Sequence, residues 1–216
     1  MVVFILFFVV AAVVGCVSYF VGQQRIRDIA AFAGAHGLTA LGSDWDMEDH
    51  GFALFQQGNR RYWRNVLRGQ WSSIPATYCD YSYVTGDGKN QNTESFSNVL
   101  GALGMHIPQV TVMPRGMIAA LAEKSVGAPG IRFESIDFND RFDVQADDSA
   151  FAVELIDAQM IETLLALDAT YHVVFGPEDV MVYAHRKAVA ELGAMFDATA
   201  LLIGRIPALA RTQPST

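Results

Sequence analysis

The first residues of the chain, 1–22, contain no Lys, Arg, Asp or Glu, and every charged side chain lies after them. At about 1.5 Å per residue, a helix over this stretch would be roughly 33 Å long, close to the hydrocarbon thickness of a bilayer. A helix that is apolar on every face is typical of a membrane span. The sequence therefore predicts a transmembrane anchor over 1–22, with its helix continuing to about residue 36.

Two processed forms of this stretch are the alternatives. A cleavable signal peptide has basic residues before a shorter apolar core, and no base precedes the run here. The tetrapeptide Val13-Val14-Gly15-Cys16 resembles a lipoprotein box, which would make Cys16 a lipidated N-terminus. The residues after Cys16 stay apolar. The uncleaved anchor is favoured over both alternatives.

Charges directly after the apolar stretch predict its orientation. Arg25 and Arg27 follow it, and only the α-amino group precedes it. The positive-inside rule then places the N-terminus outside and the domain in the cytoplasm, as in a single-pass plasma-membrane protein. Cysteine usage agrees, because Cys16 and Cys79 provide no disulfide framework.

The charge of the chain limits its partners. The formal net charge is −8, which argues against general nucleic-acid binding. Acidic residues concentrate in 134–179, where Arg141 is the one base. No Pro- or Ser-rich linker divides the chain. We expect one domain over 38–207, followed by a disordered tail over 208–216.

Hydrophobic periodicity predicts both strands and helices in this domain. The clearest strand is Ile74–Thr85, which is rich in tyrosine and β-branched residues. Further strands are predicted at 62–67, 93–100, 109–113, 131–135, 171–175 and 180–185. Residues 138–144 are predicted to lead through a turn into one more strand. Helices are predicted at 43–58, 115–125, 150–169 with Asp148 or Ser149 as its cap, and 187–206. Hairpins and helices alternate without a regular βαβ period, so the expected fold is α+β with a mainly antiparallel sheet.

One set of residues in this domain forms a pattern of phenylalanines, a valine strand, an acidic cap and a helix. Its members are Phe138, Asn139, Phe142, Val144, Asp147, Asp148, Ala152, Met160, Glu162, Leu164 and Leu165, with Asn65, Gly69, Asp80 and Gly88 upstream. In these residues the chain resembles the bacterial domain-of-unknown-function family 3137, in an actinobacterial-looking version, over about 55–185. The resemblance implies tethering by N-terminal hydrophobic helices and implies no catalytic residues. One predicted span, in place of paired spans, departs from the pattern of some members.

Four arginines form a basic cluster that is a candidate binding surface for a partner or a lipid. They are Arg60, Arg61, Arg64 and Arg68, with no acid among them. Each would contribute about 1 kcal/mol if it lay close to anionic head groups. Pairing with the acidic stretch of the same domain is the slightly favoured alternative.

Polar residues also gather around the predicted hairpin at 86–90. The Gly-Lys pair there lacks the spacing of a phosphate-binding loop, and the loop joins two strands, so a plain hairpin is favoured. The five histidines show no metal-ligand spacing, and Arg141 interrupts a calcium-like pattern at Asp137. We therefore predict no metal and no cofactor. The candidate polar residues of the hairpin are Asp80, Asp87, Lys89, Asn90 and Asn92.

The absence of a coherent catalytic set leads to a first functional hypothesis. It describes a membrane-anchored, non-catalytic cytoplasmic module that binds a protein partner or an envelope assembly. The alternatives are a membrane-tethered hydrolase, using the hairpin residues or 44–50, and a sensor of anionic lipid based on the arginine cluster.

Overall fold

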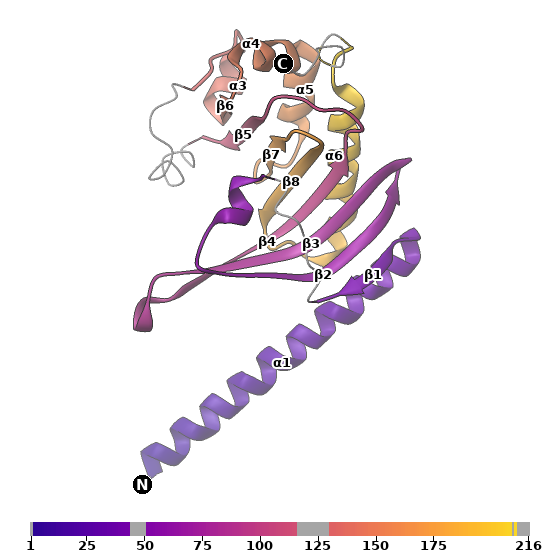
Figure 1. Ribbon diagram of the computed structural model, residues 1–216. Coiled ribbons are helices and arrows are strands. Elements are labelled where there is room, and N and C mark those ends of the chain that lie inside the picture. Colours follow the sequence, from indigo (N-terminus) through magenta and orange to yellow (C-terminus); the bar gives the residue numbers. More distant parts are fainter. Residues whose placement is uncertain (1, 44–50, 116–129, 209, 211–216) are drawn as a thin grey trace.

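The computed structural model describes residues 2–43, 51–115, 130–208 and 210. Its centre is one eight-stranded sheet with the order β1-β2-β3-β4-β8-β7-β5-β6, and all neighbouring strands are antiparallel. The long strands β2, β3 and β4 form two consecutive hairpins on one side of this sheet (Figure 1). The strands are β1 (Thr39–Gly42), β2 (Arg60–Trp71), β3 (Ile74–Thr85), β4 (Asn92–Ala102), β5 (Val110–Pro114), β6 (Phe142–Ala146), β7 (His172–Phe175) and β8 (Asp179–His185).

Helices cover one face of the sheet and enclose the larger core. This core contains Ile29 and Ala33 of α1, Phe196 and Leu202 of α6, and Tyr78 of β3. Burial of such side chains is the main stabilising term of the fold. The helices are α1 (Val2–His36), α3 (Ile136–Arg141), α4 (Ser149–Leu155), α5 (Ala158–Ala166) and α6 (Leu192–Arg205), with the 3-10 turn η3 (Val189–Glu191) before α6.

A smaller core lies on the opposite face. There the 3-10 turn η1 (Ala53–Gln56) and its flanking residues cover Tyr81, Met181 and other side chains of β3, β4, β7 and β8. A further 3-10 turn, η2 (Gly88–Asn90), closes the β3–β4 hairpin. Both faces of the central strands are therefore buried, which explains why β3 lacks a simple alternation of apolar and polar residues.

The predicted α+β class with an antiparallel sheet is confirmed. The strand Ile74–Thr85 has the predicted bounds, and β8 and β4 lie within two residues of theirs. The predicted helices over 43–58 and 115–125 fall largely on residues outside the described ranges. The described part of the first, 51–58, contains the 3-10 turn η1 in place of an α-helix.

Two local predictions are wrong. The predicted helix over 150–169 is two helices, because Ile156 leaves helical geometry and the Asp157 side chain accepts the Met160 N–H as a new N-terminal cap at 2.8 Å. The predicted strand over 131–135 has no strand pairing. It leads into α3, whose cap is the Ser135 hydroxyl, where only a turn was expected.

The predicted transmembrane anchor and plasma-membrane location require correction. Among the helices of the described residues, none has the length and apolarity that crossing a membrane demands. The predicted continuation of the helix to about residue 36 is confirmed, since α1 runs from Val2 to His36. Its C-terminal part carries Arg25, Arg27 and Asp28, and it packs Ile29 and Ala33 into the larger core. In Figure 1 its N-terminal part extends away from the sheet.

Candidate functional site

Asp80 is the buried acid around which α1 meets the sheet. It lies in the middle of β3 and is 1% exposed. A buried carboxylate is tolerated only when it is paired and hydrogen-bonded. Its Oδ1 accepts hydrogen bonds from Arg25 Nη2 and the Tyr78 hydroxyl, both at 2.7 Å, and its Oδ2 accepts from Arg25 Nε at 2.7 Å and Asn65 Nδ2 at 2.8 Å.

Arg25 is the residue of α1 that reaches this acid. Its guanidinium forms a two-point pair with Asp80, the geometry that makes arginine–carboxylate pairs strong and directional. Its Nη1 donates to the Lys187 carbonyl oxygen at 2.8 Å. The guanidinium therefore ties α1 to β3 and to the segment that follows β8. We call Arg25, Asp80, Asn65 and Tyr78 the clamp.

Asn65 enters the clamp through an irregularity of β2. The β2–β3 register shifts between Arg64 and Leu67, and Asn65 has a φ of 53°. Asparagine tolerates this left-handed conformation better than most residues. The bulge turns its side chain toward Asp80, as bulges commonly do near functional or structural sites.

The clamp carries its charges permanently at neutral pH. Burial alone would raise the pKa of Asp80, but the hydrogen bonds and charge of Arg25 outweigh it and hold the pKa below the ordinary value. Burial opposes the charge of Arg25, whereas its bonds to Asp80 raise the pKa of the guanidinium further. The consequence is a fixed ionic joint between α1 and the sheet.

Sequence reasoning missed this pairing. It used Arg25 as an orientation signal and Asp80 as a polar hairpin residue. One signal was available, since Asp80 is the single charged residue of the predicted strand Ile74–Thr85. No sequence signal identified Arg25 as its partner, because the two residues lie 55 positions apart.

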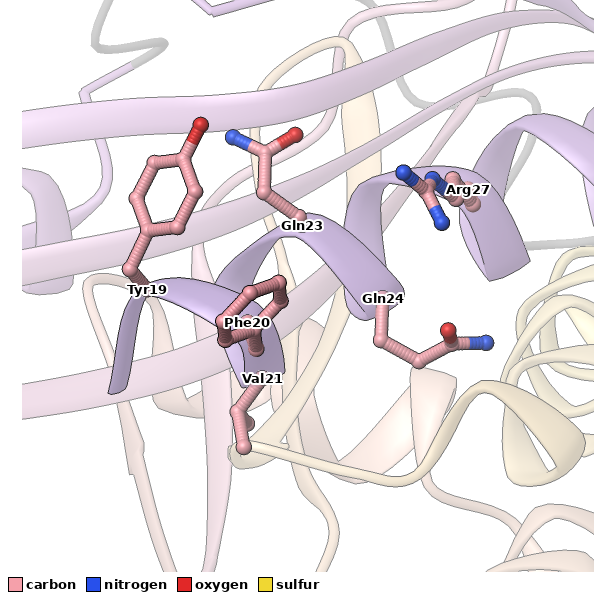
Figure 2. A pocket seen from close by; sticks show the side chains of 6 residues that line it. All are labelled: Tyr19, Phe20, Val21, Gln23, Gln24 and Arg27. Atoms are coloured by element: carbon pink, nitrogen blue, oxygen red, sulfur yellow. The ribbon is translucent and has the colours of Figure 1, made fainter. Parts of the chain in front are cut away.

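Exposed apolar residues of α1 lie next to the clamp. Phe20 is 69% exposed, and Tyr19, Val21 and Ile26 are also largely exposed. Figure 2 shows this part of the helix, where a hollow lies among Tyr19, Phe20, Val21, Gln23, Gln24 and Arg27. Clusters of exposed large apolar side chains are typical of interaction surfaces. We call Tyr19, Phe20, Val21 and Ile26 the α1 patch.

The structure does not bring the four arginines into one surface. All four are exposed on β2, but the strand places them on two faces. Arg60 and Arg64 stand opposite Val84 and Asp80, on the clamp side of the sheet. Arg61 and Arg68 lie on the other side, and Arg61 donates to the carbonyl oxygens of Gln56 and Gln57 at 2.7 and 3.2 Å.

The hairpin residues are also divided. Asp80 belongs to the buried clamp, whereas Asp87 and Asn90 are exposed at the η2 turn. Asn92 donates to Glu94 Oε1 at 2.6 Å on the exposed start of β4. The side chain of Lys89 and residues 44–50 fall outside what the structure describes. The described hairpin residues thus form no common pocket with Asp80.

The described residues also contain no group of three or more His, Cys, Asp or Glu side chains arranged to hold a metal ion. Cys79 is fully buried, and burial raises the pKa of its thiol, which keeps it in the unreactive protonated form. The clamp has the geometry of a structural contact. Its two charged groups are paired with each other and hydrogen-bonded to neighbours, so they are not free to bind a substrate.

Comparison with known proteins places the fold among solved structures. No protein-family model matches the chain, so family 3137 is not supported, and no curated protein matches it. The chain is similar to the crystal structure of the mycobacterial trehalose monomycolate transport factor A, a protein from an actinobacterium, at 13% sequence identity. The similarity has a TM-score of 0.62 and covers 90% of this chain and 98% of that one. At this identity, the chain shares its fold with that transport factor.

Proposed function

We propose that the protein is a non-catalytic binding module with a role in envelope-related transport or assembly, and that it binds a protein partner through the α1 patch. The observation that carries the proposal is the α1 patch itself, an apolar surface on a helix that the clamp fixes to the domain. The envelope context comes from the fold, which is that of a transport factor for trehalose monomycolate.

Rigid presentation is the physical argument for a binding role. A surface that is already held in its bound orientation loses less conformational entropy when a partner binds. Arg25 lies within about one and a half turns of Phe20, Val21 and Ile26 along the helix, and its guanidinium is anchored by Asp80 and the Lys187 carbonyl. The clamp therefore orients the patch relative to the whole sheet. Partner specificity would come from the aromatic residues, which dominate protein interfaces.

The alternatives have less support. A hydrolase would need polar residues that converge in a cleft, whereas Asp80 is satisfied within the clamp and Asp87 is exposed at the distant turn. Binding of anionic lipid would need a single basic surface, whereas Arg60 and Arg61 lie on opposite faces of the sheet.

Affinity purification of the tagged full chain from its native cells tests the proposal. We expect a stoichiometric partner with the wild-type protein, and loss of that partner with a Phe20→Ser and Val21→Ser variant. A matched control, Val153→Ser, changes an exposed apolar residue on α4 and should retain the partner. Repeated recovery of the wild-type protein alone, or retention of the same partner by the Phe20 and Val21 variant, would contradict it.

A further inference from the structure

A short segment covers the sheet face opposite the clamp. Residues 52–57, which we call the strap, bury the side chains of Phe52, Leu54 and Phe55 against the smaller core. A glycine stands at each end of it, and Gly51 and Gly58 have φ values of 73° and 70°. Glycine adopts this left-handed conformation without steric cost, whereas a residue with a side chain would be strained there. Both ends of the strap are therefore positions where the backbone can rotate.

Two hydrogen-bond donors lie beneath the strap without an acceptor among the residues that the structure describes. They are the Nε1 of Trp63 and the hydroxyl of Tyr81, both buried. The two rings are 5.2 Å apart, and the Phe55 ring covers both, at 6.2 Å from Trp63 and 5.0 Å from Tyr81. Buried donors are normally paired, so this pair is a departure that a bound acceptor would remove. Burial raises the pKa of Tyr81 despite the nearby charge of Arg61, so the phenol stays a donor.

A third donor group adjoins the pair and carries a charge. Arg61 lies two residues before Trp63 on β2, on the same face of the strand. Its guanidinium donates to the strap carbonyls of Gln56 and Gln57. It therefore holds the strap in place now, and it becomes available to another acceptor when the strap moves.

The surface around these donors is apolar. Leu100, Val174 and Met181 are buried in the same core as the strap phenylalanines. Phe52 also contacts the bend between β7 and β8, where a Cβ on Gly176 would come within 2.6 Å of its ring. The strap side chains thus occupy an apolar surface that begins at the three donors and continues across the sheet.

We propose that the strap is a lid over a binding site for a long-chain fatty carboxylate. The carboxylate accepts hydrogen bonds from Arg61, Trp63 and Tyr81, and the alkyl chain takes the place of Phe52 and Phe55 on the apolar surface. A carboxylate suits this set because it carries only acceptors and one negative charge, whereas Arg61 and Trp63 can only donate, Tyr81 can donate its hydroxyl, and Arg61 supplies one positive charge. The site lies on the face opposite the clamp, so it is independent of partner binding by the α1 patch.

Isothermal titration calorimetry of the full-length protein with oleate, below the critical micelle concentration, tests the site. We expect saturable binding by the wild-type protein. Arg61→Gln and Tyr81→Phe should each weaken it by about tenfold or more, the loss expected for a hydrogen bond to a charged group. The matched controls Arg60→Gln and Tyr62→Phe alter β2 residues of the other face and should leave the affinity unchanged.

Phe55→Ala gives a prediction of opposite sign. Because Phe55 competes with the alkyl chain, its removal should tighten oleate binding, provided that thermal unfolding shows a folded variant. Gly176→Ala, which pushes Phe52 off the sheet, should do the same and serves if Phe55→Ala does not fold.

A brominated fatty acid shows where the alkyl chain of the ligand binds on the protein. Dibromostearate should quench tryptophan fluorescence in the wild-type protein and in Trp71→Phe, and quench far less in Trp63→Phe. The absence of saturable oleate binding by both the wild-type protein and the opened variant would overturn the proposal. So would equal weakening by Arg60→Gln and Arg61→Gln, which would indicate surface adsorption, or equal affinity for oleyl alcohol, which has no carboxylate.

Discussion

The guanidinium of Arg25 and the carboxylate of Asp80 form a two-point ion pair, with both N–O distances at 2.7 Å, between a helix and a buried strand 55 residues apart. The pair is largely shielded from water, since Asp80 is buried and Arg25 is mostly covered. Side chains and backbone of β2, β3 and the segment after β8 complete the hydrogen bonds of both groups. This contact, together with the packing of Ile29 and Ala33 in the core, fixes how α1 sits on the domain.

Removing either partner of the pair should destabilise the protein strongly. Asp80→Asn and Arg25→Met should each lower the free energy of unfolding by about 3–5 kcal/mol, because each leaves a buried group without its partner. The double variant should lose much less than the sum of the two losses. Urea unfolding of the four proteins measures this coupling.

Arg27→Met is the matched control for the clamp. Arg27 lies two residues further along α1 and is exposed, so its loss should change the unfolding free energy by less than about 0.5 kcal/mol. Additive losses in the double variant, or equal losses for Arg25 and Arg27, would show that the ion pair does not hold α1.

His172 should make the protein sensitive to mild acid. It is 3% exposed, and its Nδ1 has no hydrogen-bond partner in the described part of the chain. Burial, with a smaller contribution from His185, lowers its pKa to about 4. The unfolded chain, with an ordinary histidine pKa of about 6.5, then binds more protons between these two values. Stability should therefore fall as the pH drops from about 6.5 to about 4, by roughly 3 kcal/mol.

Replacement of the titrating ring isolates this contribution. His172→Phe retains a ring beside Tyr183, on which His172 now stacks at 4.5 Å, and should flatten the pH dependence in this window. His106→Phe, at an exposed position, should leave the slope as it is. An unchanged slope in His172→Phe would show that other groups bind the protons.

Local pattern predicted the elements whose side chains alternate or repeat regularly. Ile74–Thr85 was identified because tyrosine and β-branched residues fit a buried strand, and the antiparallel class followed from its hairpins. The break between α4 and α5 was missed because Val153, Ile156 and Met160 keep helical spacing across it. Only the Asp157 side chain, which accepts a backbone N–H, reveals a second helix start.

The cap at Asp157 should be measurable by itself. Asp157→Ala should lower the free energy of unfolding by about 0.5–2 kcal/mol, because the Met160 N–H loses its acceptor at the start of α5. Asp147→Ala, an exposed acid of the same region outside any helix, should have a smaller effect. Equal effects on urea unfolding would contradict a capping role.

Gly176 packs closely against Phe52 of the strap, so a larger residue at this position should destabilise the protein. Gly176→Ala should lower the free energy of unfolding by about 1–3 kcal/mol, as expected when a well-packed core is overfilled. At Gly193 in α6, a Cβ would meet no described atom within 4 Å beyond the helix's own backbone and its chain neighbours. Gly193→Ala should therefore stabilise the protein by roughly 0.5–1 kcal/mol. Thermal unfolding of both variants makes the comparison, and destabilisation of the same size in both would contradict the contact.

The role of α1 is what the sequence predicted least well. The uncharged stretch over 1–22 suggested a membrane span whose helix continues to about residue 36. The structure shows one helix, Val2–His36, whose C-terminal part belongs to the core through Ile29 and Ala33. Hydropathy describes a segment by itself, whereas the clamp depends on a partner brought close only by the folded sheet.

The α1 patch as a partner surface is tested most directly by site-specific photo-crosslinking in cells. A photoreactive residue at Phe20 should give one discrete adduct with another protein. The same residue at Ile136, which is 74% exposed on α3, should give none, and Asp80→Asn should reduce the adduct at position 20 because α1 loses its anchor. Identical adducts at both positions, or no adduct at position 20 in the wild-type protein, would contradict the account.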